Sequence, residues 1–260
     1  MNPVIFVGAG PGDPELITLK AIKVLADATV VLTDYLVHPD ILLHAPQATM
    51  ISVGKSRGYH SKQQSDINQL LIDLAHAGER VVRLKGGDPG VFGRLGEELM
   101  HLVAHQIPFE IIPGVSSAFS VPLYAGIPLT YRSVSRSMAF VTATTIAEDT
   151  ASLSIPQADT VVLLMPLTVI HELSLRLQEL GFDPNTPVAV ISNGSTNAQR
   201  VHRGTIATIP TILDHDPLPS PAMMVVGQVV QYSDELSWFT PLGGDSPFVR
   251  MGGHSTNSLK

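Results

Sequence analysis

The segment VIFVGAGPGDP, from Val4 to Pro14, decides the fold class. Its apolar residues follow one another without alternation, which is typical of a buried parallel strand, and its glycines open a tight turn. We expect Asp13 to cap a helix that has Pro14 at its first position and continues to about Ala26. The segment therefore predicts a strand, a glycine turn and a helix, which is the repeating unit of α/β proteins.

The same order of elements recurs along the first half of the chain. Apolar runs predict strands over residues 29–32, 50–53, 80–84 and 109–112, and helical periodicity covers 65–77 and 97–105. In a mostly parallel sheet of this kind, ligands bind beyond the carboxyl ends of the strands. Residues suited to ligand binding follow the strands there: the GAGPGD loop, Asp34, Lys55, the KGGDP loop and the PGVSS loop.

A second α/β unit follows the turn at residues 125–130. Its strands are expected over 138–141, 160–165, 187–191, 200–205 and 223–226, with a helix over 169–180 and a helix or turn over 206–213. We therefore predict two α/β domains, residues 1–118 and 119–240, with a mostly parallel N-terminal sheet and a mixed C-terminal sheet. Residues 241–260 are rich in Gly, Pro and Ser and are expected to form a flexible tail.

Charge and composition exclude several classes of function. The 260 residues carry a formal net charge of −7, which argues against binding to nucleic acid or to an acidic membrane surface. The chain has no cysteine, so disulfides, thiolate catalysis and cysteine-type zinc sites are excluded. No apolar run is long enough to span a bilayer, and we expect a cytoplasmic protein. His101 and His105 are one helical turn apart but lack a third ligand, so no metal site is predicted.

The glycine loop alone leaves its role open. Its glycines are Gly8, Gly10 and Gly12, whereas a dinucleotide-binding fingerprint needs its third glycine where Asp13 stands. Prolines at positions 11 and 14 also remove backbone N–H groups that a pyrophosphate would use. A dinucleotide oxidoreductase is therefore disfavoured. The loop is either a ligand-binding turn or merely a tight connection between strand and helix.

Two carboxylates and a group of cations also allow more than one interpretation. Asp34 is a ribose-binding group, a catalytic carboxylate or an exposed loop residue, and Asp88 accepts hydrogen bonds from a ligand or caps a turn. Cations near the strand ends indicate a polycarboxylate or phosphate ligand, with Lys55 and Arg94 favoured. The full group is Lys55, Arg57, Lys62, Lys85, Arg94, Arg132 and Arg136.

Eight motifs follow one another between about Val4 and Val230. They are VGAGPGDPELITLKA, TDYLVHPDIL, VGKSRGYHS, VVRLKGGDPGVFGRLGEE, IPGVSSA, YAGIPLT, NGSTNAQRV and SPAMMVVG. Because these motifs occur in the family's order, the sequence resembles the tetrapyrrole (corrin/porphyrin) methyltransferase family and, within it, the branch that methylates uroporphyrinogen III. The third and fourth motifs favour this branch over the diphthine synthases and ribosomal RNA methylases of the same fold.

The resemblance implies a homodimer that binds S-adenosylmethionine in a cleft between the two domains of each subunit. It implies methylation of uroporphyrinogen III at C2 and then C7, giving precorrin-2 for siroheme and cobalamin synthesis, without a metal. Asp34 and Lys55 match the family's acid/base positions, while Arg94, also taken as catalytic, and Glu97 face the tetrapyrrole. The implied cofactor residues are Pro11, Gly86, Gly87, Asp88, Val91, Ser116, Ser117, Met165 and Gly194.

Several positions depart from the family pattern. Gly90 and Val91 replace an aromatic residue and an isoleucine, Tyr131 replaces a histidine, Ala143 and Thr144 replace a Gly-His pair, and Pro166 replaces a glycine. These departures keep two alternatives open: a catalytically weakened tetrapyrrole- or cofactor-binding paralogue, and a methylase for another precorrin. Since Asp34, Lys55, the GGD loop and Arg94 are intact, an active enzyme is favoured.

Overall fold

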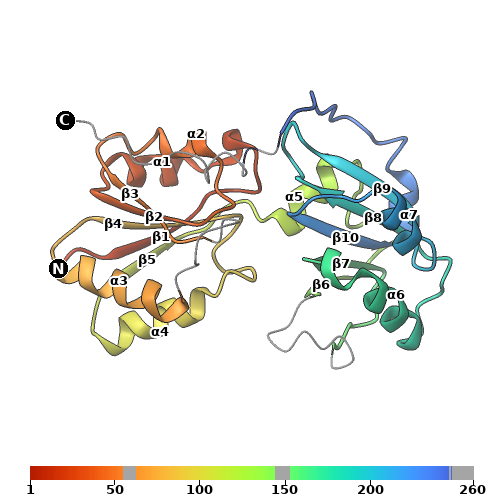
Figure 1. The fold of residues 1–260 in the computed structure, drawn as a ribbon, viewed down its shortest axis with the longest axis horizontal. Helices are drawn as coiled ribbons and strands as arrows, with labels where there is room; N and C mark the ends of the chain where they lie inside the picture. Colours follow the sequence, from red (N-terminus) through yellow and green to blue (C-terminus); the bar gives the residue numbers. More distant parts are fainter. Residues whose placement is uncertain (55–62, 144–152, 246, 248–260) are drawn as a thin grey trace. The chain divides into compact units, whose positions relative to one another are not determined.

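A computed structural model of the chain describes residues 1–54, 63–143, 153–245 and 247 (Figure 1). It contains two compact units, Met1–Ser117 and Ala118–Gly244, each built on a five-stranded sheet. The first sheet is parallel throughout and the second is mixed. The predicted α/β class with one parallel and one mixed sheet is therefore confirmed. Most of the predicted tail lies outside the described residues.

The first unit has its strands in the order β3-β2-β4-β1-β5. Its elements are β1 (Val4–Gly8), a 3-10 turn (Pro14–Leu16), α1 (Leu19–Ala26), β2 (Val30–Thr33), α2 (Pro39–Leu42), β3 (Thr49–Ser52), α3 (Gln64–His76), β4 (Val81–Lys85), α4 (Leu95–Ala104) and β5 (Phe109–Ile112). The first strand, β1, thus lies between β4 and β5, the last two strands of its unit.

Helices cover both faces of this parallel sheet (Figure 1). Side chains alternate along each strand, so neighbouring residues point to opposite faces. Val7, Val31 and Leu84 pack with Leu25 of α1, whereas Phe6 and Leu32 pack with Leu71 of α3. The inner strands β1, β2 and β4 are therefore buried on both faces, which explains the largely apolar character of their sequences.

The second unit has its strands in the order β6-β7-β10-β8-β9. Its elements are α5 (Ser117–Tyr124), β6 (Met138–Thr142), β7 (Thr160–Leu164), a 3-10 turn (Leu167–Val169), α6 (Ile170–Glu179), β8 (Pro187–Ser192), β9 (Arg200–Thr205), α7 (Ile209–His215), β10 (Ala222–Gly227) and a final 3-10 turn (Gln228–Tyr232). One core lies on the side of α6 and α7, and a second lies against α5. None of the described helices has the length and apolar character that crossing a membrane requires.

The prediction of one helix from Pro14 to Ala26 was wrong. Asp13 caps only the short 3-10 turn, where its carboxylate accepts a hydrogen bond from Glu15 N at 2.9 Å. The chain is extended again at Ile17, and α1 begins after Thr18, whose hydroxyl accepts from Ala21 N at 3.2 Å. Two residues able to cap a helix lie five positions apart, and the later one starts the α-helix.

Candidate functional site

Three strand ends meet at the glycine loops of the first unit. Gly87 N donates to Gly10 O at 2.7 Å and Gly10 N donates to Gly87 O at 3.2 Å, so the loops after β1 and β4 form a small antiparallel bridge. A Cβ placed on Gly8 would lie 2.5 Å from Gly114 N and 2.7 Å from Gly87 O. The backbones of the three loops therefore pack directly on one another, which requires glycine at position 8.

Gly8→Ala is expected to lower the free energy of unfolding by about 1–3 kcal/mol or more, because the added methyl group must push backbone rather than a flexible side chain. Urea titration followed by circular dichroism measures this loss. Gly96→Ala is the matched control, since a Cβ at Gly96, inside α4, meets no atom within 4 Å. The control is expected to be neutral or stabilising. Equal stability of the two variants would contradict the steric interpretation.

Asp88 connects two of these loops through its carboxylate. Oδ1 accepts from Gly90 N at 2.8 Å and Oδ2 accepts from Gly114 N at 3.0 Å. The turn interpretation of Asp88 is therefore found in the structure, and it extends across the sheet because Gly114 follows β5. The contact between Asp88 and Gly114 holds the KGGDP and PGVSS loops together, and the neighbouring Gly86 and Gly87 carry no side chains.

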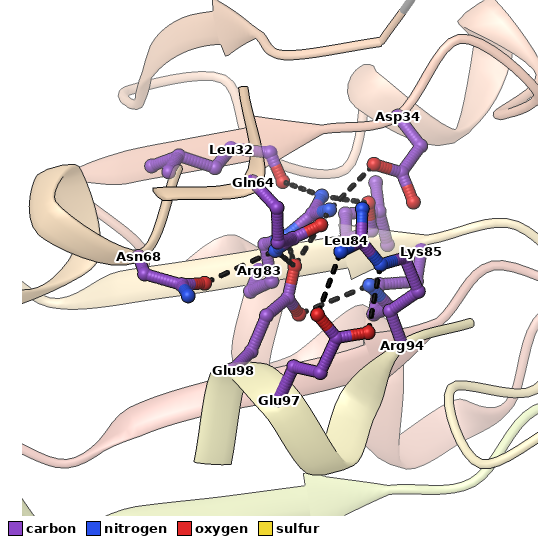
Figure 2. A network of polar contacts seen from close by, with 10 residues as sticks. All are labelled: Leu32, Asp34, Gln64, Asn68, Arg83, Leu84, Lys85, Arg94, Glu97 and Glu98. Carbon is purple, nitrogen blue, oxygen red and sulfur yellow. Dashed lines mark hydrogen bonds and ion pairs between the residues drawn. The ribbon is translucent and has the colours of Figure 1, made fainter. Parts of the chain in front are cut away.

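A cluster of charged groups lies beside the loops, on the face covered by α3 and α4 (Figure 2). We call Asp34, Gln64, Arg83, Lys85 and Glu98 the Arg83 cluster. Arg83 Nη2 donates to Asp34 Oδ1 at 2.6 Å and to Glu98 Oε1 at 3.1 Å. Lys85 Nζ donates to the other oxygen of Glu98 at 3.0 Å, and Gln64 Nε2 donates to Oε1 at 3.1 Å. Asp34, just after β2, is thus bound to Arg83 of β4 and, through Arg83, linked to Glu98 of α4.

The charged members of the cluster are deeply buried, except for Asp34. Side-chain exposure is 0% for Glu98, 3% for Arg83 and 4% for Lys85, but 30% for Asp34. Burial lowers the pKa of Lys85 below its usual range, and the charge of Arg83 lowers this pKa further, while Asp34 and Glu98 oppose the shift. Asp34 is therefore the member of the cluster whose carboxylate reaches solvent, at the carboxyl edge of the sheet.

The sequence prediction identified Asp34 but missed Arg83, Glu98 and the ionic role of Lys85. A signal was present in the strand VVRLK, where Arg83 and Lys85 alternate with apolar residues and so point to one face. Charged residues in a strand buried on both faces require partners. Their partner Glu98 follows in the GEE motif at the first turn of α4.

Arg94 and Glu97 form a separate pair at the start of α4. Arg94 Nε and Nη2 donate to the two carboxylate oxygens of Glu97 at 2.8 and 2.6 Å. This hydrogen bonding is the main cause that lowers the pKa of the exposed Glu97 carboxyl below its usual range. Arg94 has a left-handed backbone with φ of 55° and caps the helix by position without a side-chain hydrogen bond. Both side chains are about half exposed, so the pair is accessible to an anionic ligand.

The remaining predicted site residues that the structure describes are distributed over both units. Pro11, Gly86, Val91, Ser116 and Ser117 lie in or beside the loops of the first unit. In the second unit, Met165 follows β7 with φ of 56° and is half exposed, and Gly194 follows β8. A Cβ on Gly194 would lie 2.2 Å from Val121 Cγ1, so this loop packs tightly on α5. Lys55, Arg57, Lys62 and Thr144 lie outside the described residues.

Three of the departures from the family pattern, Tyr131, Ala143 and Pro166, have local structural roles. Tyr131 stacks on Tyr232 with ring centroids 4.6 Å apart and 9° between the planes. Ala143 is buried in the core beside α6, and Pro166 precedes the 3-10 turn that leads into α6.

The described residues contain no group of three or more histidines and carboxylates that could hold a metal ion.

The family model for Tetrapyrrole (Corrin/Porphyrin) Methylases matches residues 3–210. The chain therefore belongs to this family of S-adenosylmethionine-dependent methylases. The siroheme synthases of Nitrosomonas eutropha and Chromobacterium violaceum are 46% and 44% identical to it over 244 and 241 residues. These matches cover 92% and 91% of this chain but 51% of each relative, so the chain spans about half the length of the curated relatives it matches.

Solved structures of the same family share the fold. A uroporphyrin-III-C-methyltransferase from Thermus thermophilus is 42% identical with a TM-score of 0.79, covering 92% of this chain and 98% of that one. Another structure, of a uroporphyrin-III C-methyl transferase from Thermus thermophilus complexed with S-adenyl homocysteine, is 36% identical with a TM-score of 0.76, covering 88% of this chain and 99% of that one. The resemblance read from the eight motifs is thereby confirmed.

Proposed function

We propose that this chain transfers methyl groups from S-adenosylmethionine to C2 and C7 of uroporphyrinogen III, giving precorrin-2. The observation that carries the proposal is Asp34, a partly exposed carboxylate held by an ion pair of 2.6 Å beside the glycine loops. The 42% identity to the Thermus uroporphyrin-III-C-methyltransferase supports the choice of substrate. Since the curated relatives are about twice as long, methylation is proposed for the portion that this chain represents.

The glycine loops suit a bulky methyl donor. A Cβ on Gly86 would approach Leu36 O to 3.2 Å, and Gly87 has φ of 65°, so both positions favour residues without side chains. Exposed backbone at such positions allows a ligand to approach closely. We assign the donor to Pro11, Gly86, Gly87, Asp88, Val91, Ser116 and Ser117 of the first unit and to Met165 and Gly194 of the second.

The reaction needs placement and the handling of one proton for each methyl group. The ring nitrogen makes a pyrrole carbon nucleophilic, and the sulfonium supplies the methyl group that this carbon attacks. The enzyme aligns the two and removes a proton afterwards. We assign proton handling to Asp34 with Lys55, and assign Arg94, beside Glu97, to the acetate and propionate arms of the tetrapyrrole. We further propose that the enzyme works as a cytoplasmic homodimer.

The test is a single incubation. Purified protein, S-adenosylmethionine and uroporphyrinogen III are mixed without oxygen, and mass spectrometry is expected to show two added methyl groups. A matched sample without the donor defines the unreacted mass. Unmodified substrate, with the donor still bound in calorimetry, would contradict the proposal and favour the binding paralogue. Methylation of another precorrin alone would favour the remaining alternative.

A further inference from the structure

Buried charge is concentrated at one place in the first unit. Arg83 and Lys85 of β4 and Glu98 in the first turn of α4 are at least 96% buried, and Lys85 directly precedes a loop assigned to the donor. Buried ion pairs add little to stability, because removing the charges from water offsets their attraction. Apolar residues could fill this space as they do along the rest of the α3 and α4 face. The cluster is therefore better explained by its effect on the orientation of the Asp34 carboxylate.

Arg83 is held in one orientation by its other contacts. Nε and Nη2 donate to Glu98 Oε1 at 3.2 and 3.1 Å, and Nη1 donates to the carbonyl oxygens of Leu84 at 3.3 Å and Leu32 at 3.5 Å. A guanidinium is planar, so these bonds fix the direction of the remaining Nη2 donation. That donation reaches Asp34 Oδ1 (Figure 2).

Glu98 also balances the charge of the cluster. It accepts from Arg83 through Oε1 and from Lys85 through Oε2. With Asp34, the cluster holds two cations and two carboxylates, which gives it no net charge. Gln64 Nε2 of α3 donates to Glu98 Oε1 at 3.1 Å and to Asn68 Oδ1 at 3.0 Å, and Asn68 Nδ2 lies 3.0 Å from His101 Nδ1 on α4.

We propose that Arg83 is a positioning residue, which Glu98 orients and which in turn fixes the Asp34 carboxylate for proton removal. This inference rests on the proposed function. Within the described part of the chain, Asp34 Oδ2 takes no hydrogen bond, so it is the oxygen available to the substrate. The methylated carbon becomes quaternary and carries no hydrogen, and methyl transfer leaves a positive charge on the ring system while S-adenosylhomocysteine departs. As an N–H or neighbouring C–H bond of that ring system then breaks, its electron pair stays in the ring system and the proton forms an O–H bond with the Asp34 carboxylate. Arg83 touches neither substrate nor donor in this role.

A double-mutant cycle tests the proposal. Arg83→Met is expected to lower kcat by about 30-fold while KM for both substrates changes less than about threefold, since misplacement of a catalytic group acts on turnover. When Asp34 is already alanine, the same change is expected to lower kcat by less than about threefold, because the group that Arg83 positions is gone. A structural role alone would give equal losses in both backgrounds, and this result would overturn the proposal.

One further variant separates the charge of Arg83 from the geometry of its hydrogen-bond donors, and a second serves as a control. Arg83→Lys keeps a cation but loses the planar set of donors, so it is expected to recover only part of the kcat lost in Arg83→Met. Arg80→Met is the matched control, because Arg80 is exposed and immediately precedes the amino end of the same strand. It is expected to leave kcat unchanged. Melting temperatures confirm that each variant is folded before it is assayed.

A crystal structure of the Arg83→Met variant tests whether Arg83 positions Asp34, independently of any activity assay. We expect the Asp34 side chain to leave its present orientation or to occupy several. An Asp34 carboxylate in its original place would contradict the inference even if kcat fell. If the wild-type protein does not methylate uroporphyrinogen III, the proposed function fails, and this structure still tests whether Arg83 positions Asp34.

Discussion

Asp34→Ala is expected to lower kcat by about 10²–10⁴-fold, the range by which a positioned acid or base accelerates a reaction. The carboxylate lies at the carboxyl edge of the parallel sheet and is the only charged member of the Arg83 cluster with substantial exposure. Affinity for S-adenosylmethionine is expected to change little, because the donor is assigned to the glycine loops and not to Asp34. Single-turnover kinetics and calorimetry measure the two quantities separately.

Asp40→Ala provides the matched control for this change. Asp40 is an exposed carboxylate in the short helix α2, paired with His38 at 3.8 Å. Its removal is expected to leave both kcat and donor affinity unchanged. If Asp34→Ala weakened donor binding as much as it slowed turnover, Asp34 would be a donor ligand and not the group that handles the proton.

Glu98→Ala is expected to destabilise the protein by about 3–5 kcal/mol, because it leaves two buried cations without their shared partner. Glu98 is completely buried, and each of its carboxylate oxygens accepts from a different cation. Urea titration of wild type and variant measures the loss. A loss of this size would be a large fraction of the total free energy of unfolding, since folded domains are only marginally stable.

The neighbouring Glu97→Ala is the control for Glu98→Ala. Glu97 belongs to the same turn of α4 and is also paired with an arginine, but its side chain is half exposed. Its ion pair is screened by water, so its removal is expected to change stability much less. Similar losses for the two variants would show that helix α4 itself, and not the buried charge balance, is sensitive to substitution.

Local patterns predicted most of the fold. The strands Phe109–Ile112 and Arg200–Thr205 begin and end where the sequence indicates, and the others differ by one or two residues. Strand signals are local because they depend on apolar runs and on the turns that bound them. The start of α1 was missed because two residues suited to capping compete, and α5 was hidden within the PGVSS loop and the residues after it.

The charged cluster could not be predicted as easily, because its contacts join distant parts of the chain. Arg83 is 49 residues from Asp34, and Glu98 is 15 residues from Arg83. No local pattern says which strand neighbours which, and only the order β2-β4 in the sheet brings Asp34 and Arg83 together. The glycine motifs located the edge of the site, while the ionic contacts behind it follow from the topology.

The place of β1 in the sheet has a consequence for synthesis of the protein. β1 is made before the other strands of its unit, yet its two neighbours are β4, which begins at Val81, and β5, which begins at Phe109. At roughly 5–20 residues per second, the first strand waits several seconds on the ribosome before a partner strand emerges. During that interval its apolar residues have no sheet to join. The glycine bridge between Gly10 and Gly87 therefore closes late, after most of the first unit has left the ribosome.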